Sequence, residues 1–242
     1  MINQNKVRWL RGGLGDVLLK VGNIKPDEFY IVFSHLKQTA DLVSVYTTNF
    51  KYINMAKPAG DVPNPVASMV YPPMLIPYES TQKAYNSLSK NKKIIGIHPI
   101  GSKMSRDFDI NKKRPQKIMS AEFIKTIVAT FKNNNTEILL FCAPNEVDLF
   151  KDFDVRVIAE PYIWDCIAYV SFCDLVIATD SAIKTFSAVL HIPTIVVMGD
   201  YEDKIRDETF INPYKEITPI RFTDIDLVID KVILKAKELL KI

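Results

Sequence analysis

Short apolar runs alternate with amphipathic stretches along most of the 242-residue chain, and the alternation is most regular from residue 91 onward. The apolar runs in this part contain few polar positions, which is typical of parallel strands buried on both faces of a sheet. Strands are predicted at 93–99, 137–143, 155–160, 174–180 and 194–200, and helices at 120–134, 145–153, 162–173, 181–191 and 224–241. The second part of the chain is therefore predicted to be a domain of alternating strands and helices.

The first part of the chain has a less regular pattern. Predicted there are strands at 6–10 and 29–35, a helix or strand-like continuation at 36–46, and a short helix at 80–91. Segment 57–79 holds six of the fourteen prolines, which favours loop or extended edge structure. We therefore expect an α/β protein of two Rossmann-like domains, a small one at 1–90 and a larger one at 91–242 that ends in a helix.

Composition narrows the classes of function. The net charge is +3, from 31 basic and 28 acidic residues, so the chain is not a general polyanion binder. No apolar run approaches the roughly 20 residues of a membrane span, and the first ten residues lack the apolar core of a signal peptide. The three cysteines lack disulfide or metal-ligand spacing, which favours buried free thiols in a reducing compartment. These features predict a cytoplasmic protein without a membrane span.

Ligands of open α/β sheets bind outside the carboxyl ends of the strands. This rule selects the loops after Leu10, Pro99, Cys142 and Thr179 as candidate binding segments.

The first of these loops lies in RGGLGDVLLK, where three of the chain's eight glycines precede an aspartate. One interpretation is that Gly12, Gly13 and Gly15 form a tight strand-to-helix turn and that Asp16 is a helix-start carboxylate. The other is that the glycines let the backbone and the Asp16 carboxylate approach a ligand.

The second loop starts with Gly101-Ser102 and carries six basic residues between 103 and 117. Its hydroxyl, amides and cations suit a phosphate group, although a solvated basic loop explains the same pattern.

The other two loops each open a predicted helix with a carboxylate. Asp180 and Ser181 begin the helix at 181–191, whose N-terminal amides suit a phosphate, and Asp180 can also cap that helix. Glu146 lies in the first turn of the helix at 145–153, where it can accept hydrogen bonds from ribose hydroxyls or favour the helix dipole.

The four loops together resemble the motifs of the heptosyltransferases, glycosyltransferase family 9. LRGGLGDVLL is similar to the family's first-strand motif, HPIGS…KKRP…SAEF to its donor-phosphate segment, and FCAPNE to its ribose-binding segment. ATDSAIKTFSAVLHIPTIVVMGD resembles its diphosphate-binding signature, so that the resemblance covers most of residues 91–200 and about fifteen residues near the start. It implies the GT-B architecture of two facing Rossmann-like domains and an inverting, metal-independent transfer of a sugar to an acceptor hydroxyl. A nucleotide-diphosphate sugar is the implied co-substrate, no separate cofactor is expected, and the acceptor is a carbohydrate or a lipid-linked molecule.

The resemblance also assigns roles to individual residues. Asp16 falls on the general base, which takes the proton of the acceptor hydroxyl. Ser102 and Lys113 fall on the hydroxyl and lysine of the phosphate segment, and Glu146 falls on the ribose-binding glutamate. The predicted donor site consists of Gly12, Gly13, Gly15, Ser102, Lys113, Glu146, Asp180, Ser181, Ala182 and Thr185.

Four departures from the family pattern are visible. The glycine of the diphosphate signature is Ala182 here, its histidine is Thr185, and the tryptophan between lysine and proline is Arg114. The first half, at about 90 residues, is short for an acceptor domain.

A metal site is not assigned. Asp107–Asp109 and Asp152–Asp154 form two Asp-x-Asp pairs that suit Mg²⁺ or Mn²⁺. The second pair lies in a predicted surface link, and the basic neighbours of the first can neutralise phosphate without a metal. The histidines His35, His98 and His191 lack partners at metal-ligand spacing, so structural roles are expected for them.

Two alternatives to a sugar transferase of this kind stay open. One is a phage-type glycosyltransferase acting on a modified DNA base, suggested by the short first half and the basic loop. Against it stands the lack of an extended basic and aromatic surface, so nucleic acid is not the favoured partner. The other is a degenerate, non-catalytic protein that binds sugar nucleotides, suggested by Ala182 and Thr185.

Overall fold

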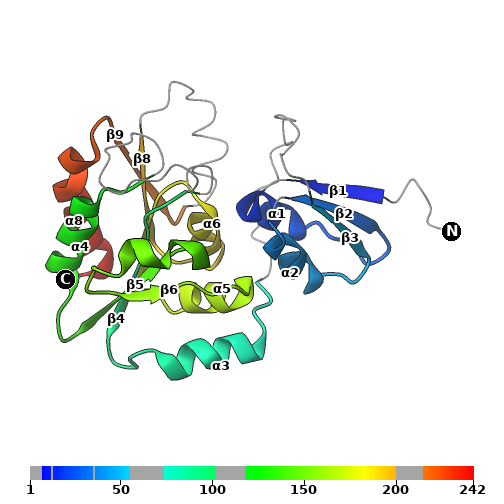
Figure 1. The fold of residues 1–242 in the computed structure, drawn as a ribbon, viewed down its shortest axis with the longest axis horizontal. Coiled ribbons are helices and arrows are strands. Elements are labelled where there is room, and N and C mark those ends of the chain that lie inside the picture. The colour runs from blue at the N-terminus through cyan, green and yellow to red at the C-terminus, as the bar shows by residue number, and fades with distance from the viewer. Residues whose placement is uncertain (1–6, 12, 35, 55–73, 102–117, 200–214) are drawn as a thin grey trace.

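The computed structural model describes residues 7–11, 13–34, 36–54, 74–101, 118–199 and 215–242, and the side chains of residues 9, 11, 16 and 19 lie outside that description. Two parallel sheets organise the chain (Figure 1). The smaller sheet has the order β1-β2-β3, and the larger has the order β6-β5-β4-β7-β8-β9.

The smaller sheet is built from sequential strand–helix units. Its elements are β1 (Val7–Arg11), α1 (Leu14–Val21), β2 (Phe29–Ser34), α2 (Gln38–Ser44) and β3 (Phe50–Asn54). Every second residue of β2 is buried, and Leu42 and Val43 of α2 are completely buried, so the helices cover one face of the sheet. Segment 36–46, for which two interpretations were open, therefore forms a helix.

The larger sheet is covered by helices on both faces. Its strands are β4 (Lys93–His98), β5 (Thr136–Phe141), β6 (Arg156–Ile158), β7 (Leu175–Ala178), β8 (Thr194–Gly199) and β9 (Ile217–Phe222). The helical segments of this part are α4 (Ala121–Phe131), η2 (Pro144–Phe150), α5 (Ile163–Ser171), α6 (Ala182–Val189), η4 (Ile225–Val228) and α8 (Ile229–Leu240). One core cluster contains apolar side chains of α5 and α6, and the other contains those of α4 and α8. Because helices cover both faces of the sheet, every residue of β7 and β8 is buried, which explains why the sequences of these two strands are almost entirely apolar.

Gly96 shows how tightly the sheet is covered. A Cβ atom at this position would lie 2.8 Å from Phe141 Cε2, closer than real contacts allow, and 3.0 Å from Cys173 Sγ, which is a tight contact. The three cysteines are buried and free, as expected.

The α/β class predicted from the sequence is confirmed, and the structure adds detail to the predicted elements. Strands β3 and β9 were not predicted, and the segment at 145–153 forms a 3-10 helix, η2, instead of an α-helix. The final helix is also divided, because η4 precedes α8. The helices that the structure describes are all too short or too polar to span a lipid bilayer.

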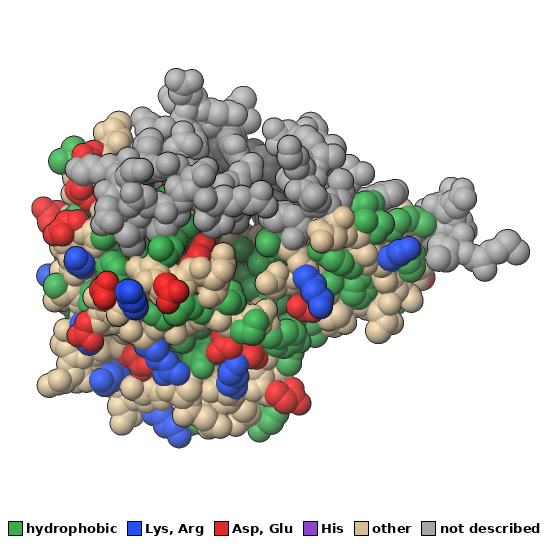
Figure 2. All heavy atoms as spheres, in the orientation of Figure 1, with side chains coloured by type: hydrophobic (Ala, Val, Ile, Leu, Met, Phe, Trp, Pro, Cys, Tyr) green, Lys and Arg blue, Asp and Glu red, His purple; other side chains and the backbone are tan. Residues whose placement is uncertain are grey.

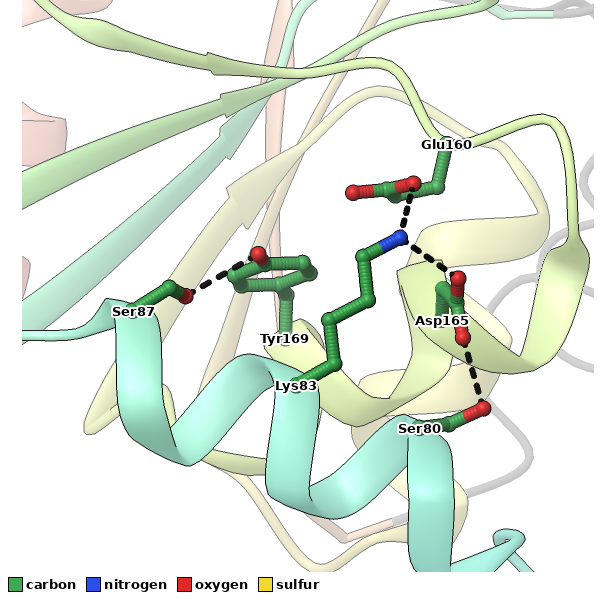
Figure 3. A network of polar contacts seen from close by, with 6 residues as sticks. All are labelled: Ser80, Lys83, Ser87, Glu160, Asp165 and Tyr169. Atoms are coloured by element: carbon green, nitrogen blue, oxygen red, sulfur yellow. Dashed lines mark hydrogen bonds and ion pairs between the residues drawn. The ribbon is translucent and has the colours of Figure 1, made fainter.

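Helix α3 (Tyr78–Ser87) packs on α5 through a network of polar contacts (Figure 3). Lys83 Nζ lies 2.7 Å from both Glu160 Oε2 and Asp165 Oδ2, and these hydrogen bonds raise the pKa of Lys83 above its usual range. Ser80 Oγ donates to Asp165 Oδ1 at 2.6 Å, and Ser87 Oγ donates to the Tyr169 hydroxyl at 3.0 Å. Helix α3 is thereby attached to the part of the chain that carries the larger sheet, and the domain division at residue 90 stays a prediction.

The two sheets are joined by helix packing, with α1 against α6 and α2 against α5. Trp164 on α5 is completely buried in this junction, and its Nε1 donates to the Asp41 carbonyl oxygen at 2.9 Å. The ring of Tyr46 lies 6.3 Å from the Trp164 ring, between centroids. A single apolar cluster therefore includes residues from both parts of the chain.

Candidate functional site

The larger sheet has a topological switch point between β4 and β7. The chain runs outward from β4 to β5 and β6, and then returns to place β7 on the other side of β4. Residues His98 and Ala178 pair across these two strands, and the Thr179 amide donates to the His98 carbonyl oxygen at 3.1 Å. Such a point leaves the carboxyl ends of the two strands accessible to a ligand, because the connecting segments diverge to opposite sides.

Buried polar atoms without partners gather at this switch point. Within the described part of the chain, three buried side-chain atoms have no hydrogen-bond partner: His98 Nδ1, Thr179 Oγ1 and Ser181 Oγ. Such an atom costs about 1–3 kcal/mol of stability, so most buried polar groups of proteins are paired. The three atoms belong to the last residue of β4 and to the first residues after β7, and this concentration indicates a binding site.

Burial also determines the charge of His98. Loss of hydration lowers the pKa of His98 to about 4, so the imidazole is neutral near pH 7. A neutral imidazole has one N–H donor and one acceptor nitrogen, so it can pair with a hydroxyl or with a phosphate oxygen.

The N-terminus of α6 lies at the same place in the fold. Ser181 is the N-cap residue with an extended backbone (φ −151°, ψ 175°), but its side chain makes no capping hydrogen bond. Asp180 forms an ion pair with Lys184 at 2.8 Å, and its expected capping role stays a prediction. The first amides of α6 thus receive no hydrogen bond from the Ser181 side chain, and amides at a helix start can bind anions.

Close helix packing joins the glycine turn to the start of α6. A Cβ atom on Gly15 would lie 3.1 Å from Thr185 Oγ1 and 3.5 Å from the Ala182 Cα, so a larger residue fits only if the Thr185 side chain gives way. The first turns of the two helices follow β1 and β7 respectively, so two of the four predicted binding loops meet here. Gly13 is partly exposed, and Asp16 belongs to the first turn of α1 with its side chain outside the described structure.

Glu146 lies after β5, one strand away from the switch point. Its side chain is 7% exposed, and its Oε2 accepts a hydrogen bond from the Ala143 amide at 2.9 Å. Burial raises the pKa of the Glu146 carboxyl, an effect that the Ala143 amide partly offsets. The carboxylate therefore stabilises the start of η2, and its role toward a ribose stays a prediction.

Several predicted residues fall outside the described part of the chain. They are Gly12, Ser102, Lys113, Arg114 and the first Asp-x-Asp pair, Asp107–Asp109. The second pair, Asp152–Asp154, follows η2 with both aspartates exposed, and Lys132 forms an ion pair with Asp154. In the residues that are described, no three His, Cys, Asp or Glu side chains are grouped so that they could hold a metal ion.

The structure adds three residues that the sequence did not assign to the site: His98, Thr179 and Lys184. His98 had been expected to be structural, yet its unpartnered Nδ1 lies at the switch point. The sequence signal for Lys184 is a charged residue within a helix of otherwise apolar or small residues.

The described residues carry charges of both signs on one face of the molecule. On the face shown in Figure 2, lysine and arginine side chains of the described residues are interspersed with aspartate and glutamate.

No protein-family model matches the chain, and no curated protein matches its sequence. Solved structures do match. The ADP-heptose LPS heptosyltransferase II of E. coli aligns with a TM-score of 0.55 and 13% identity, over 97% of this chain and 76% of that chain. A glycosyl transferase of family 9 from Veillonella parvula DSM 2008 aligns with a TM-score of 0.54 and 14% identity, over 94% of this chain and 77% of that chain. At these identities the likeness concerns the fold, and the chain therefore has the GT-B fold of the family 9 heptosyltransferases that its motifs resemble.

Proposed function

We propose that the protein is a glycosyltransferase that moves a sugar from a nucleotide-diphosphate donor to an acceptor hydroxyl, with inversion and without a metal ion. The observation that carries this proposal is the group of unpartnered buried atoms at the switch point, beside the start of α6, where the Ser181 side chain makes no capping hydrogen bond. A diphosphate would supply the missing hydrogen-bond partners, and the GT-B fold agrees with a sugar-nucleotide ligand. The E. coli structural match is named for ADP-heptose, which makes ADP a first nucleotide to try.

Each group at the site has a chemical task in this proposal. The hydroxyls of Thr179 and Ser181 donate hydrogen bonds to phosphate oxygens, together with the first amides of α6. These donors, with Lys113 and Ser102 of the predicted phosphate segment, stabilise the charge that develops on the departing nucleoside diphosphate. Aligned amides and lysines of this kind replace the divalent cation that other sugar transferases use.

Asp16 is the proposed general base. Support comes from the contact of Gly15 with Thr185, which brings the first turn of α1 against the first turn of α6. An acceptor hydroxyl bound near Asp16 would then face a donor held at α6, and the carboxylate would take its proton as the new glycosidic bond forms. The acceptor in this proposal is a carbohydrate or a lipid-linked molecule.

Nucleotide binding tests the donor site. Thermal shifts with ADP, UDP, GDP and CDP should identify at least one that stabilises the protein, and EDTA should leave the shift unchanged. Loss of the shift on adding EDTA would contradict the metal-free site. Binding without turnover on any labelled sugar nucleotide would indicate a non-catalytic protein instead.

Replacing Asp16 tests the chemistry. Asp16→Asn keeps the size of the side chain but cannot accept the proton, so turnover should fall by roughly 10²–10⁴ with donor affinity close to wild type. The exposed Asp152 supplies a matched control, since Asp152→Asn should leave turnover unchanged. Full activity of Asp16→Asn would exclude Asp16 as the base.

A further inference from the structure

Lys184 is a buried lysine in the first turn of α6. The residue is 4% exposed, and its Nζ lies 2.8 Å from Asp180 Oδ1. The two side chains are 5% and 16% exposed, so the ion pair is largely shielded from water.

Helix stability does not explain this lysine. A cation in the first turn opposes the helix dipole, which favours negative charge at this end. Burial of an ion pair also costs hydration energy, which an apolar residue of similar size would avoid. The surroundings of Lys184 therefore supply the reason for a lysine at this position.

The surroundings of the pair are suited to an anion. Thr179, which is 1% exposed and whose Oγ1 has no partner, directly precedes Asp180. Ser181, whose Oγ also lacks a partner and makes no capping hydrogen bond, directly follows it at the start of α6. An ionised Asp180 between these two hydroxyls would repel a diphosphate, unless a cation compensates its charge.

We infer that Lys184 is a positioning residue for the donor, which acts by neutralising Asp180. The ammonium of Lys184 offsets the charge of the Asp180 carboxylate, so the helix amides and the two hydroxyls can accept the diphosphate of a nucleotide donor. This inference rests on the proposed donor site and adds to it the residue that makes the site compatible with an anion.

Two substitutions separate this role from a direct contact. Lys184→Met keeps the length of the side chain and removes the charge, so the affinity for a nucleoside diphosphate should fall at least 10-fold. Asp180→Asn combined with Lys184→Met removes both charges, and affinity should return to within about 3-fold of wild type. Asp180→Asn alone should bind as tightly as wild type or more tightly, because Lys184 then adds positive charge.

Three probes are used. The first is whichever of ADP, UDP, GDP and CDP binds the wild-type protein most tightly, the second is the corresponding nucleoside without phosphates, and the third is inorganic pyrophosphate. Affinities are measured by calorimetry in EDTA, at a temperature where circular dichroism shows every variant fully folded. Lys184→Met should weaken the diphosphate and pyrophosphate but leave nucleoside affinity unchanged, an outcome that a merely structural role would not produce. Lys83→Met on α3 is the matched control, since Lys83 also pairs with carboxylates but in the network of Figure 3, and diphosphate affinity should not change.

Among the variants, three results would overturn the inference. They are unchanged affinity in Lys184→Met, an equal loss for nucleoside and diphosphate, and a double variant that binds as weakly as Lys184→Met. The last result would mean that the ammonium contacts the phosphate itself. If the wild type binds pyrophosphate but no nucleoside diphosphate, the proposed nucleotide donor is refuted. The role of Lys184 is then tested by the affinities of the same variants for pyrophosphate. A wild type that binds neither would refute both.

Discussion

The stability of the protein should depend on pH through His98. Burial lowers the pKa of this imidazole from 6.5 to about 4, and its Nδ1 has no partner that could stabilise a charge. In the unfolded chain His98 binds its proton near pH 6.5, so between pH 6.5 and about 4 the unfolded state holds more protons than the folded state. The contribution of His98 to stability is therefore fully present above pH 6.5 and is lost as the pH falls through this window. The difference between the two pKa values corresponds to about 3 kcal/mol.

Denaturation by urea at several pH values between 4 and 8 measures this effect. His98→Asn cannot take up the proton, so the stability difference between wild type and variant should change by up to about 3 kcal/mol across the window. This comparison cancels the titration of His35 and His191, which both proteins share. Parallel stability curves for the two proteins, or an NMR titration of His98 near 6.5, would refute the reasoning.

A ligand extends the same experiment to function. A diphosphate bound at the switch point would favour the imidazolium form and raise the pKa of His98. An NMR titration in the presence of the tightest nucleoside diphosphate should show this rise, whereas a remote binding site would leave the pKa unchanged.

Two further predictions concern packing. Trp164→Ala should lower the free energy of unfolding by about 3–5 kcal/mol, because it empties the junction between the two sheets, and unchanged stability in urea denaturation would contradict the shared core. Gly96→Ala should cost about 1–3 kcal/mol, because the new Cβ atom would lie 2.8 Å from Phe141 Cε2; a melting temperature equal to wild type would show that β4 can shift without cost.

Apolar periodicity was sufficient to predict the interior strands of the larger sheet. Strands such as β7 and β8 are buried on both faces, so their sequences are almost entirely apolar and are visible without a structure. The two missed strands lie at sheet edges. β3 is only partly buried, and β9 contains Pro219, which is tolerated because an edge strand has amides that need no partner.

The sequence by itself also determined which chemical groups follow each strand, since Asp180-Ser181 and the glycine turn are local patterns. Only the tertiary structure determined which of these chemical groups lie next to one another. Two strands, β5 and β6, separate β4 from β7 along the chain, and pairing across that distance is what brings His98 beside Thr179. The contact of Gly15 with Thr185 and the burial of Lys184 beside Asp180 arise in the same way. Strand order, burial and ion pairing depend on packing between segments far apart in the chain, and local periodicity does not carry that information.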